Sequence, residues 1–387
     1  MFFYLEKQRS LIHNVGSSTF RTPLGSMRKL MRFITGIFER LQSHPKRVVF
    51  PEGQDSRVIQ AARQFFTLKL GIPILLGSRK QIRETADKLS IALEGVRIID
   101  PTQSDDLETF ARRFELLRRS YGLNLDGARE AMYQPNYYAS MMLAMHQADA
   151  MVSGAVDSSS VVLHPLLQII HPAEGTQTVC GSQIIELGDA DNARIGSDGV
   201  LFLADCSIQQ DPTIEQLADI AVATARLALQ ITSEPPRVAL LSLTTHESAV
   251  AQGITSKEYA AAMLAASRAE KEGIKAFFDG ELQADAALIS EIAQRKLGSG
   301  ELGPVAGKAN VLIFPNMEAA DISSRLVQHL ARTNIYGDIL LGIDRPVAVL
   351  SRAATAHDIL GVAAILGEQC NRYRRMYPGV GIRIPGE

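Results

Sequence analysis

The 387-residue chain contains no tryptophan and only three cysteines, at positions 180, 206 and 370. Their wide separation argues against a disulfide framework and shows no metal-type spacing such as C-x-x-C. We therefore expect small, buried, reduced cysteines. The chain also lacks any uninterrupted apolar run near the ~20 residues that a membrane-spanning helix requires. These absences favour a cytoplasmic protein without a membrane segment.

Charge of one sign is also missing, because the net charge is −2 and the pI is about 6.5. Such a balance supplies no general field for polyanions, so we expect no nucleic-acid partner. The exception is residues 1 to 47, with nine Lys or Arg against two Asp or Glu. We interpret residues 1–27 as a leader or tag-like extension rather than a targeting signal. Apolar residues from Leu30 to Leu41 then recur at steps of three and four, which predicts a helix.

Short apolar runs alternate with segments of helical period through the rest of the chain. Predicted strands are 47–50, 72–76, 96–99, 150–152, 200–203, 238–241, 276–278 and 311–314, and predicted helices in the second half are 213–230, 255–271, 283–296, 317–331 and 356–372. Strands that are apolar throughout indicate a parallel sheet covered by helices on both faces. The Gly-rich segment 181–199 is interpreted as loops. The length and the 46% hydrophobic content favour two such α/β domains.

Ligands of parallel α/β sheets bind where strands end and helices begin, because free N–H groups and positive helix ends meet there. One candidate loop follows the strand at 150–152 and contains Ser153, Gly154 and the hydroxyls of Ser158, Ser159 and Ser160. These serines fit phosphate binding. Serines that only cap a helix are the commoner alternative.

A second candidate loop is the segment 350–358, where Ser351 and Arg352 adjoin and Asp358 follows at the start of an apolar helix. Such a group can remove a proton and stabilise a developing oxyanion if Asp358 folds back towards Ser351. The competing interpretation is an Asp that only stabilises the helix dipole. No nucleotide-binding glycine loop and no metal-ligand pattern is present, so we predict no metal and no permanently bound cofactor.

Several ordered motifs at these same loops resemble the phosphate acetyltransferase and phosphate butyryltransferase family, over roughly residues 28 to 375. The motifs are Arg47-Val48-Val49-Phe50-Pro51-Glu52-Gly53, Ala148-Asp149-Ala150-Met151-Val152-Ser153-Gly154, Leu203-Ala204-Asp205-Cys206, Asp279-Gly280-Glu281-Leu282-Gln283, Val305-Ala306-Gly307-Lys308-Ala309-Asn310, Phe314-Pro315-Asn316-Met317-Glu318-Ala319 and Leu350-Ser351-Arg352.

The resemblance implies a homodimer whose subunits hold coenzyme A, as a substrate, in a cleft between two three-layer α/β domains. The division it implies is 28–172 with 340–387, and 173–339. It also implies that Asp358 takes the proton of the coenzyme thiol and that the thiolate attacks an acyl phosphate. Ser351 and Arg352 would stabilise the oxyanion or the leaving phosphate, and Arg118 would bind the coenzyme. The partners would be coenzyme A and either acyl phosphate or phosphate.

Three positions depart from the pattern of that family. His164 stands where a second ligand-binding arginine is usual, Asp157 where a histidine is common, and Ala353 where a glycine is usual. A histidine is mostly neutral at pH 7, whereas arginine is permanently charged. If a charged His164 replaces the arginine, affinity for the phosphate-bearing ligand falls as pH rises. Two alternatives to phosphate acetyl transfer stay open: a module that senses acyl-coenzyme A without turnover, and a transferase for another short acyl group.

Overall fold

The structure is a computed structural model that describes residues 32–173, 176–188, 194–246, 255–298, 302–331 and 333–376. The predicted extension at 1–27 lies outside these residues. The first elements along the chain are α3 (Arg32–Gln42), β1 (Lys46–Phe50), α4 (Ser56–Thr67), β2 (Gly71–Leu76), α5 (Arg79–Lys88), β3 (Arg97–Ile99), α6 (Leu107–Arg118), α7 (Leu125–Met132), α8 (Pro135–Ala144), β4 (Ala150–Ser153) and α9 (Ser159–Ile169). Short 3₁₀ turns flank α6 at Pro101–Gln103 and Arg119–Tyr121.

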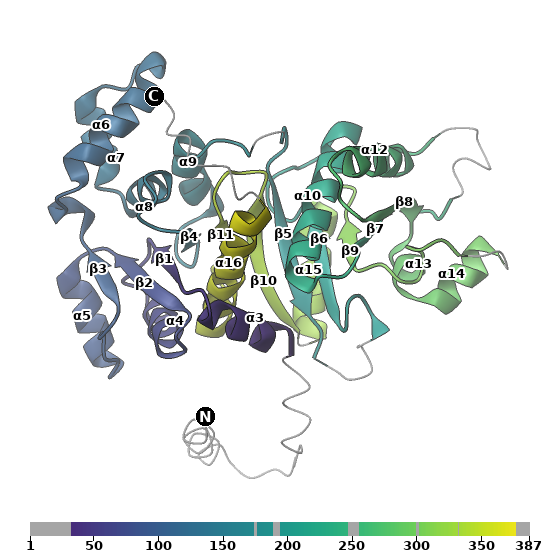
Figure 1. The fold of residues 1–387 in the computed structure, drawn as a ribbon, viewed down its shortest axis with the longest axis horizontal. Helices are drawn as coiled ribbons and strands as arrows, with labels where there is room; N and C mark the ends of the chain where they lie inside the picture. The colour runs from purple at the N-terminus through teal and green to yellow at the C-terminus, as the bar shows by residue number, and fades with distance from the viewer. Residues whose placement is uncertain are drawn as a thin grey trace, which may run out of the picture.

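The remaining elements complete a large sheet (Figure 1). They are β5 (Cys180–Glu186), β6 (Val200–Ala204), α10 (Ile214–Thr232), β7 (Arg237–Leu241), α12 (Lys257–Lys271), β8 (Phe277–Leu282), α13 (Ala284–Leu288), α14 (Ser290–Leu297), β9 (Val311–Ile313), α15 (Met317–Leu330), β10 (Asn334–Leu341), β11 (Val347–Val349) and α16 (Ala356–Met376). The sheet has eleven strands in the order β3-β2-β1-β4-β11-β10-β5-β6-β9-β7-β8. Pairing is parallel except around β5 and β10, which confirms a mixed α/β fold with a mainly parallel sheet.

The predicted apolar strands match observed ones because their side chains enter two cores in alternation. In β1, Val48 and Phe50 join the core beneath α3, α4, α10, α12 and α16, whereas Val49 joins the core beneath α6 to α9. In β6, Phe202 faces the first of these cores and Leu203 faces a third, beneath α13 to α15. Helices therefore cover both faces of the sheet.

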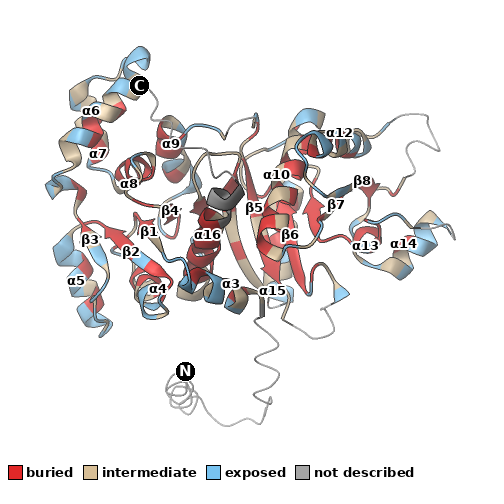
Figure 2. Ribbon diagram, in the orientation of Figure 1, coloured by how far each residue is buried: buried red, intermediate tan, exposed pale blue. Residues whose placement is uncertain are grey.

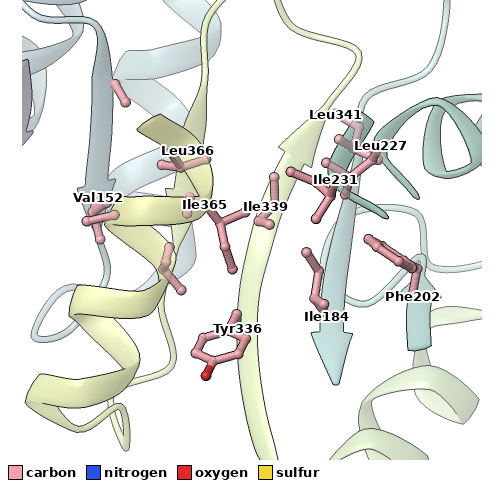
Figure 3. Packing of buried hydrophobic residues seen from close by; sticks show 14 of the residues in the cluster. Val152, Ile184, Phe202, Leu227, Ile231, Tyr336, Ile339, Leu341, Ile365 and Leu366 are labelled. Atoms are coloured by element: carbon pink, nitrogen blue, oxygen red, sulfur yellow. The ribbon is translucent and has the colours of Figure 1, made fainter. Parts of the chain in front are cut away.

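Helix α16 occupies the centre of the molecule and is among its most buried elements (Figure 2). Ile365 of this helix points toward Ile339 of β10, while Ile184 of β5 lies on the other side of that strand (Figure 3). The ring of Tyr336 packs where Gly361 leaves room, since a Cβ there would lie 2.3 Å from it. The C-terminal helix thus joins the two halves of the sheet.

Two sequence predictions were wrong. The supposed loop at 181–199 begins inside β5, whose polar Ser182 and Gln183 disguised a strand that pairs with β10 and β6. The helix predicted at 283–296 is two helices that meet at Ile289. The break arises because the carbonyls of Ala286 and Ala287 accept N–H groups from the segment at Gly307 to Ala309 instead of continuing the helix.

All three cysteines are buried, as expected, and no disulfide joins them. Within the described residues, no helix has the length and apolar character needed to cross a membrane.

Candidate active site

Three parallel strands, β1, β4 and β11, end side by side at one edge of the sheet. The loop after each strand leads into a helix, and these helices are α4, α9 and α16. The first turn of a helix presents N–H groups and a partial positive charge. This edge therefore suits an anionic ligand.

Ser351, Arg352 and Asp358 lie where β11 leads into α16. Ser351 and Arg352 are exposed, and Asp358 is half-buried in the first turn of the helix. The N–H and hydroxyl of Thr355 donate to Asp358 Oδ2, each at 2.8 Å, and the Asp358 N–H donates to Thr355 Oγ1 at 3.2 Å. The carboxylate thus folds back over its own helix end, but its hydrogen-bond partner is Thr355 and not Ser351. Ser351 Oγ instead accepts the N–H of Ala353 at 3.3 Å.

The N-terminus of α9 differs from its two neighbours at this edge. Asp55 caps α4 through two backbone N–H groups, and Thr355 caps α16. Ser158, at the corresponding position of α9, makes no side-chain cap, and its hydroxyl lies 3.0 Å from that of Ser160. Ser158 and Ser160 are both exposed residues. Of the three helix ends, that of α9 is the one left open for a ligand.

Ser153 lies at this loop but is completely buried. Its hydroxyl donates to Asn136 Oδ1 at 2.9 Å, and Asn136 Nδ2 donates to Asp157 Oδ2 at 2.7 Å. Ser153 therefore orients Asn136 rather than presenting its hydroxyl at the surface. The Asp157 carboxylate is thereby engaged by an amide donor.

Two residues that the sequence analysis did not identify, Gln168 and Tyr137, connect His164 to the neighbourhood of Arg118. Gln168 Nε2 lies 2.7 Å from His164 Nε2, and the hydroxyl of Tyr137 donates to Gln168 Oε1 at 3.2 Å. Burial raises the pKa of the Tyr137 hydroxyl, while the nearby charge of Arg118 acts in the opposite direction. Arg118 also lies over the ring of Tyr121, 4.3 Å from its centre. The structure therefore groups Arg118, Tyr137, Gln168 and His164.

His164 and the open helix end belong to one surface. Ser160 and His164 are exposed and four residues apart, so they lie on the same side of α9. His164 follows Ser158 by six residues, about 9 Å along the helix axis. A ligand that reaches from the helix end to the imidazole would be the size of a small phosphate compound.

Glu52 and Arg57 also form hydrogen bonds with the loops at this edge, although the sequence analysis gave these residues no role. The carboxylate of Glu52 accepts four backbone N–H groups from the loop after β4. The Pro-Glu-Gly turn sequence after β1 is the signal that could have identified Glu52. Arg57 lies in the first turn of α4, where an arginine carries no distinguishing pattern. No group of three or more His, Cys, Asp or Glu in the described ranges is placed to hold a metal ion.

This architecture defines a class: a mixed α/β protein in which hydroxyls, cations and carboxylates gather where parallel strands end and helices begin. Residues 32–366 match the family described as "Phosphate acetyl/butaryl transferase", and the chain belongs to that family of acyltransferases.

The chain is 39% identical to a phosphate acetyltransferase of Acetivibrio thermocellus, across 88% of this chain and 98% of that one. It is 38% identical to one from Thermoanaerobacterium thermosaccharolyticum, across 88% and 99%. Among solved structures, a phosphotransacetylase from Streptococcus pyogenes superposes with a TM-score of 0.77 at 32% identity, across 88% and 99% of the two chains.

Proposed function

We propose that this protein is a phosphate acetyltransferase, which interconverts acetyl-CoA plus phosphate and acetyl phosphate plus CoA. The observation that carries the proposal is that Ser351, Arg352 and Asp358 follow β11, whose loop contacts the loop that leads from β4 into α9, in a chain that belongs to this family. Phosphate transfer to or from an acyl group needs an anion site and a base, and this edge offers both.

In the proposed reaction the thiol of CoA gives its proton to Asp358. Both hydrogen bonds from Thr355 end on Oδ2, so Oδ1 would take that proton. The thiolate sulfur then bonds to the carbonyl carbon of acetyl phosphate. The carbon–oxygen bond to phosphate breaks, and phosphate leaves with the electron pair. Ser351 and Arg352 stabilise the negative charge that develops.

Thioester formation from acetyl phosphate and CoA tests this function. Asp358→Asn retains an oxygen that can accept from Thr355 but removes the base, so we expect kcat to fall about 100-fold or more. Thr355→Ala is the matched control, because it removes the cap but keeps the carboxylate. It costs about 1 kcal/mol of stability, and kcat should change far less.

Other results would select the alternatives. Tight CoA binding without turnover of any acyl phosphate would indicate a sensing module. A higher kcat/KM for propionyl or butyryl phosphate would indicate another acyl group. An Asp358→Asn variant with full activity would eliminate the proposed base.

The remaining assignments extend the proposal. Arg118 would bind CoA, and its position beside Tyr137 and Gln168 near His164 supports this. An unchanged KM for CoA in Arg118→Ala would refute it.

A homodimer is supported by an apolar row on the surface of α15, formed by Ile322, Leu326 and Leu330, which are 59%, 55% and 80% exposed. Sedimentation of the native protein and of Leu326→Glu tests it.

The division into 28–172 with 340–387, and 173–339, is supported by the position of β11 next to β4. Limited proteolysis that released no fragment of either unit would count against it. The cytoplasmic location stays a prediction, and recovery in the membrane fraction would refute it.

A further inference from the structure

The carboxylate of Glu52 occupies a ring of backbone donors. Oε2 accepts the N–H groups of Gly154 and Ala155 at 3.1 and 2.8 Å. Oε1 accepts those of Val156 and Asp157 at 3.0 and 2.8 Å. Consecutive N–H groups that converge in this way form an anion site, and here the protein's own side chain fills it. The loop after β4 is thereby held to the end of β1.

Arg57 makes the second connection, between the loops after β4 and β11. Its Nη1 donates to the carbonyls of Arg352 and Ala354 at 2.8 and 2.9 Å, and its Nη2 donates to the carbonyl of Ala155 at 2.7 Å. Asp55 accepts from Nε and from Nη2. All five N–H groups of the guanidinium therefore have acceptors, which leaves the side chain a single orientation.

The two loops are also in direct contact. Leu350 donates its N–H to the carbonyl of Ser153 at 2.7 Å. Gly154 has a φ of 103°, and a Cβ there would lie 2.7 Å from the carbonyl oxygen of Leu350. The main chain before Ser351 thus packs on the turn before Ser158 with no room for a side chain.

We propose that Glu52 and Arg57 are positioning residues, here named the Glu52–Arg57 clamp, which set Ser351 and Arg352 against the open end of α9. This inference rests on the proposed function. The clamp does not touch substrate in the proposed reaction. Its role is geometric, because a displacement of about 1 Å between reacting groups can reduce a rate about 100-fold.

Glu52→Ala combined with added formate tests the clamp. The substitution empties the ring of donors, so loop 154–157 should exchange its amide hydrogens faster and kcat should fall about 100-fold. Formate carries one carboxylate and fits the vacated ring. We expect it to restore slow exchange and at least about a tenth of the lost activity. KM for CoA should change little, because neither Glu52 nor Arg57 bonds to Arg118, the proposed CoA contact.

Asp149→Ala is the matched control at the opposite ends of β1 and β4. Asp149 accepts from the backbone N–H of Arg47 and from its guanidinium, at 2.9 to 3.2 Å, so its removal also breaks a β1–β4 connection. We expect reduced stability, a nearly normal kcat and no response to formate. Arg57→Ala should respond to low guanidinium concentrations in place of formate.

Each outcome decides the inference. The clamp would be overturned if Glu52→Ala kept more than half of the native kcat. It would also be overturned if the variant were inactive and formate restored neither its kcat nor its slow amide exchange. If Glu52→Ala does not fold, Glu52→Gln, which keeps one accepting oxygen, replaces it, and an unreduced kcat there would have the same meaning. A native protein inactive with every acyl phosphate would instead overturn the proposed function, and the clamp's catalytic role with it.

Discussion

Each half of the sheet contains a carboxylate that accepts four backbone N–H groups just after a strand, but the two carboxylates connect different parts of the structure. Glu52, after β1, takes all four from a loop 102 to 105 residues away. Asp205, after β6, takes three from Ser207, Ile208 and Gln209 and one from Gly181. Glu52 is half-buried at the candidate site, whereas Asp205 is 2% exposed. The first therefore joins loops of the candidate site, and the second closes a local turn in the interior.

Burial dominates the environment of the interior carboxylate. Loss of hydration raises the pKa of Asp205 in spite of the four N–H groups that favour its charged form. The hydrogen bonds of Asp205 stabilise the local structure, although burial of its charge costs free energy. We infer that the comparison separates a carboxylate that matters for rate from one that matters for folding.

The largest expected difference between the Glu52 and Asp205 variants is in the free energy of unfolding. Asp205→Ala leaves four N–H groups without their acceptor in the interior, and each buried unsatisfied group costs about 1–3 kcal/mol. We expect a loss of at least about 3 kcal/mol by urea unfolding. Glu52→Ala should cost about 1 kcal/mol, because water reaches the vacated loop. If Asp205→Ala is too unstable to purify, Asp205→Asn should show an intermediate loss. The opposite order for Glu52 and Asp205 would remove the distinction.

A carboxylate in the middle of the sheet sharpens the same contrast through the pH dependence of stability. Burial, with Asp205 and Asp321 nearby, raises the pKa of Asp338 from 3.8 to about 6, although Gln183 Nε2 donates to its Oδ1 at 2.7 Å. Because the folded state holds this proton more tightly than the unfolded state, its contribution to stability is fully present below about pH 4. It is lost as pH rises through about 6.

Asp338→Asn keeps the acceptor for Gln183 and removes the charge. It should match the native protein at pH 4 and exceed its stability at pH 7 by about 2–3 kcal/mol, the value of a shift near two pKa units. Thermal unfolding across this range measures the difference. Equal pH profiles for the two proteins would show that Asp338 does not titrate in this way.

The sequence predicted most of the fold because strands such as β4, β6 and β9 are apolar and buried on both faces. It failed in the middle of the sheet, where β5 and β10 carry polar residues that satisfy one another, such as Gln183 and Asp338. These strands look like loops until their partners are known. Gln183 and Asp338 are 155 residues apart in the sequence, and no local pattern of polar and apolar residues indicates that they pair.

The candidate site was predicted with the same limits. Strand ends and helix starts located Ser158, Ser351, Arg352 and Asp358, because local patterns mark where a strand gives way to a helix. The partners of those residues were not predictable. Thr355 takes the bond foreseen for Ser351, and Ser153 is turned inward by Asn136.

The smallest predicted effect concerns the departure at His164. Gln168 holds the imidazole through Nε2 on the exposed side of α9 that also carries Ser160. His164→Arg places a permanent charge there. We expect the KM for phosphate to fall about 3- to 10-fold, since an exposed charge is partly screened.

Leu167→Arg is the control for this substitution, because Leu167 is 48% exposed on the same helix. It adds the same charge about one turn further from the open end. An equal fall in KM would mean that the general field of the helix matters, and not the place of residue 164. A fall confined to His164→Arg would show that the imidazole occupies a phosphate contact and that Gln168 sets its direction. Native activity at that contact would then depend on an imidazole that Gln168 orients, unlike the fully engaged guanidinium of Arg57 at the neighbouring loops.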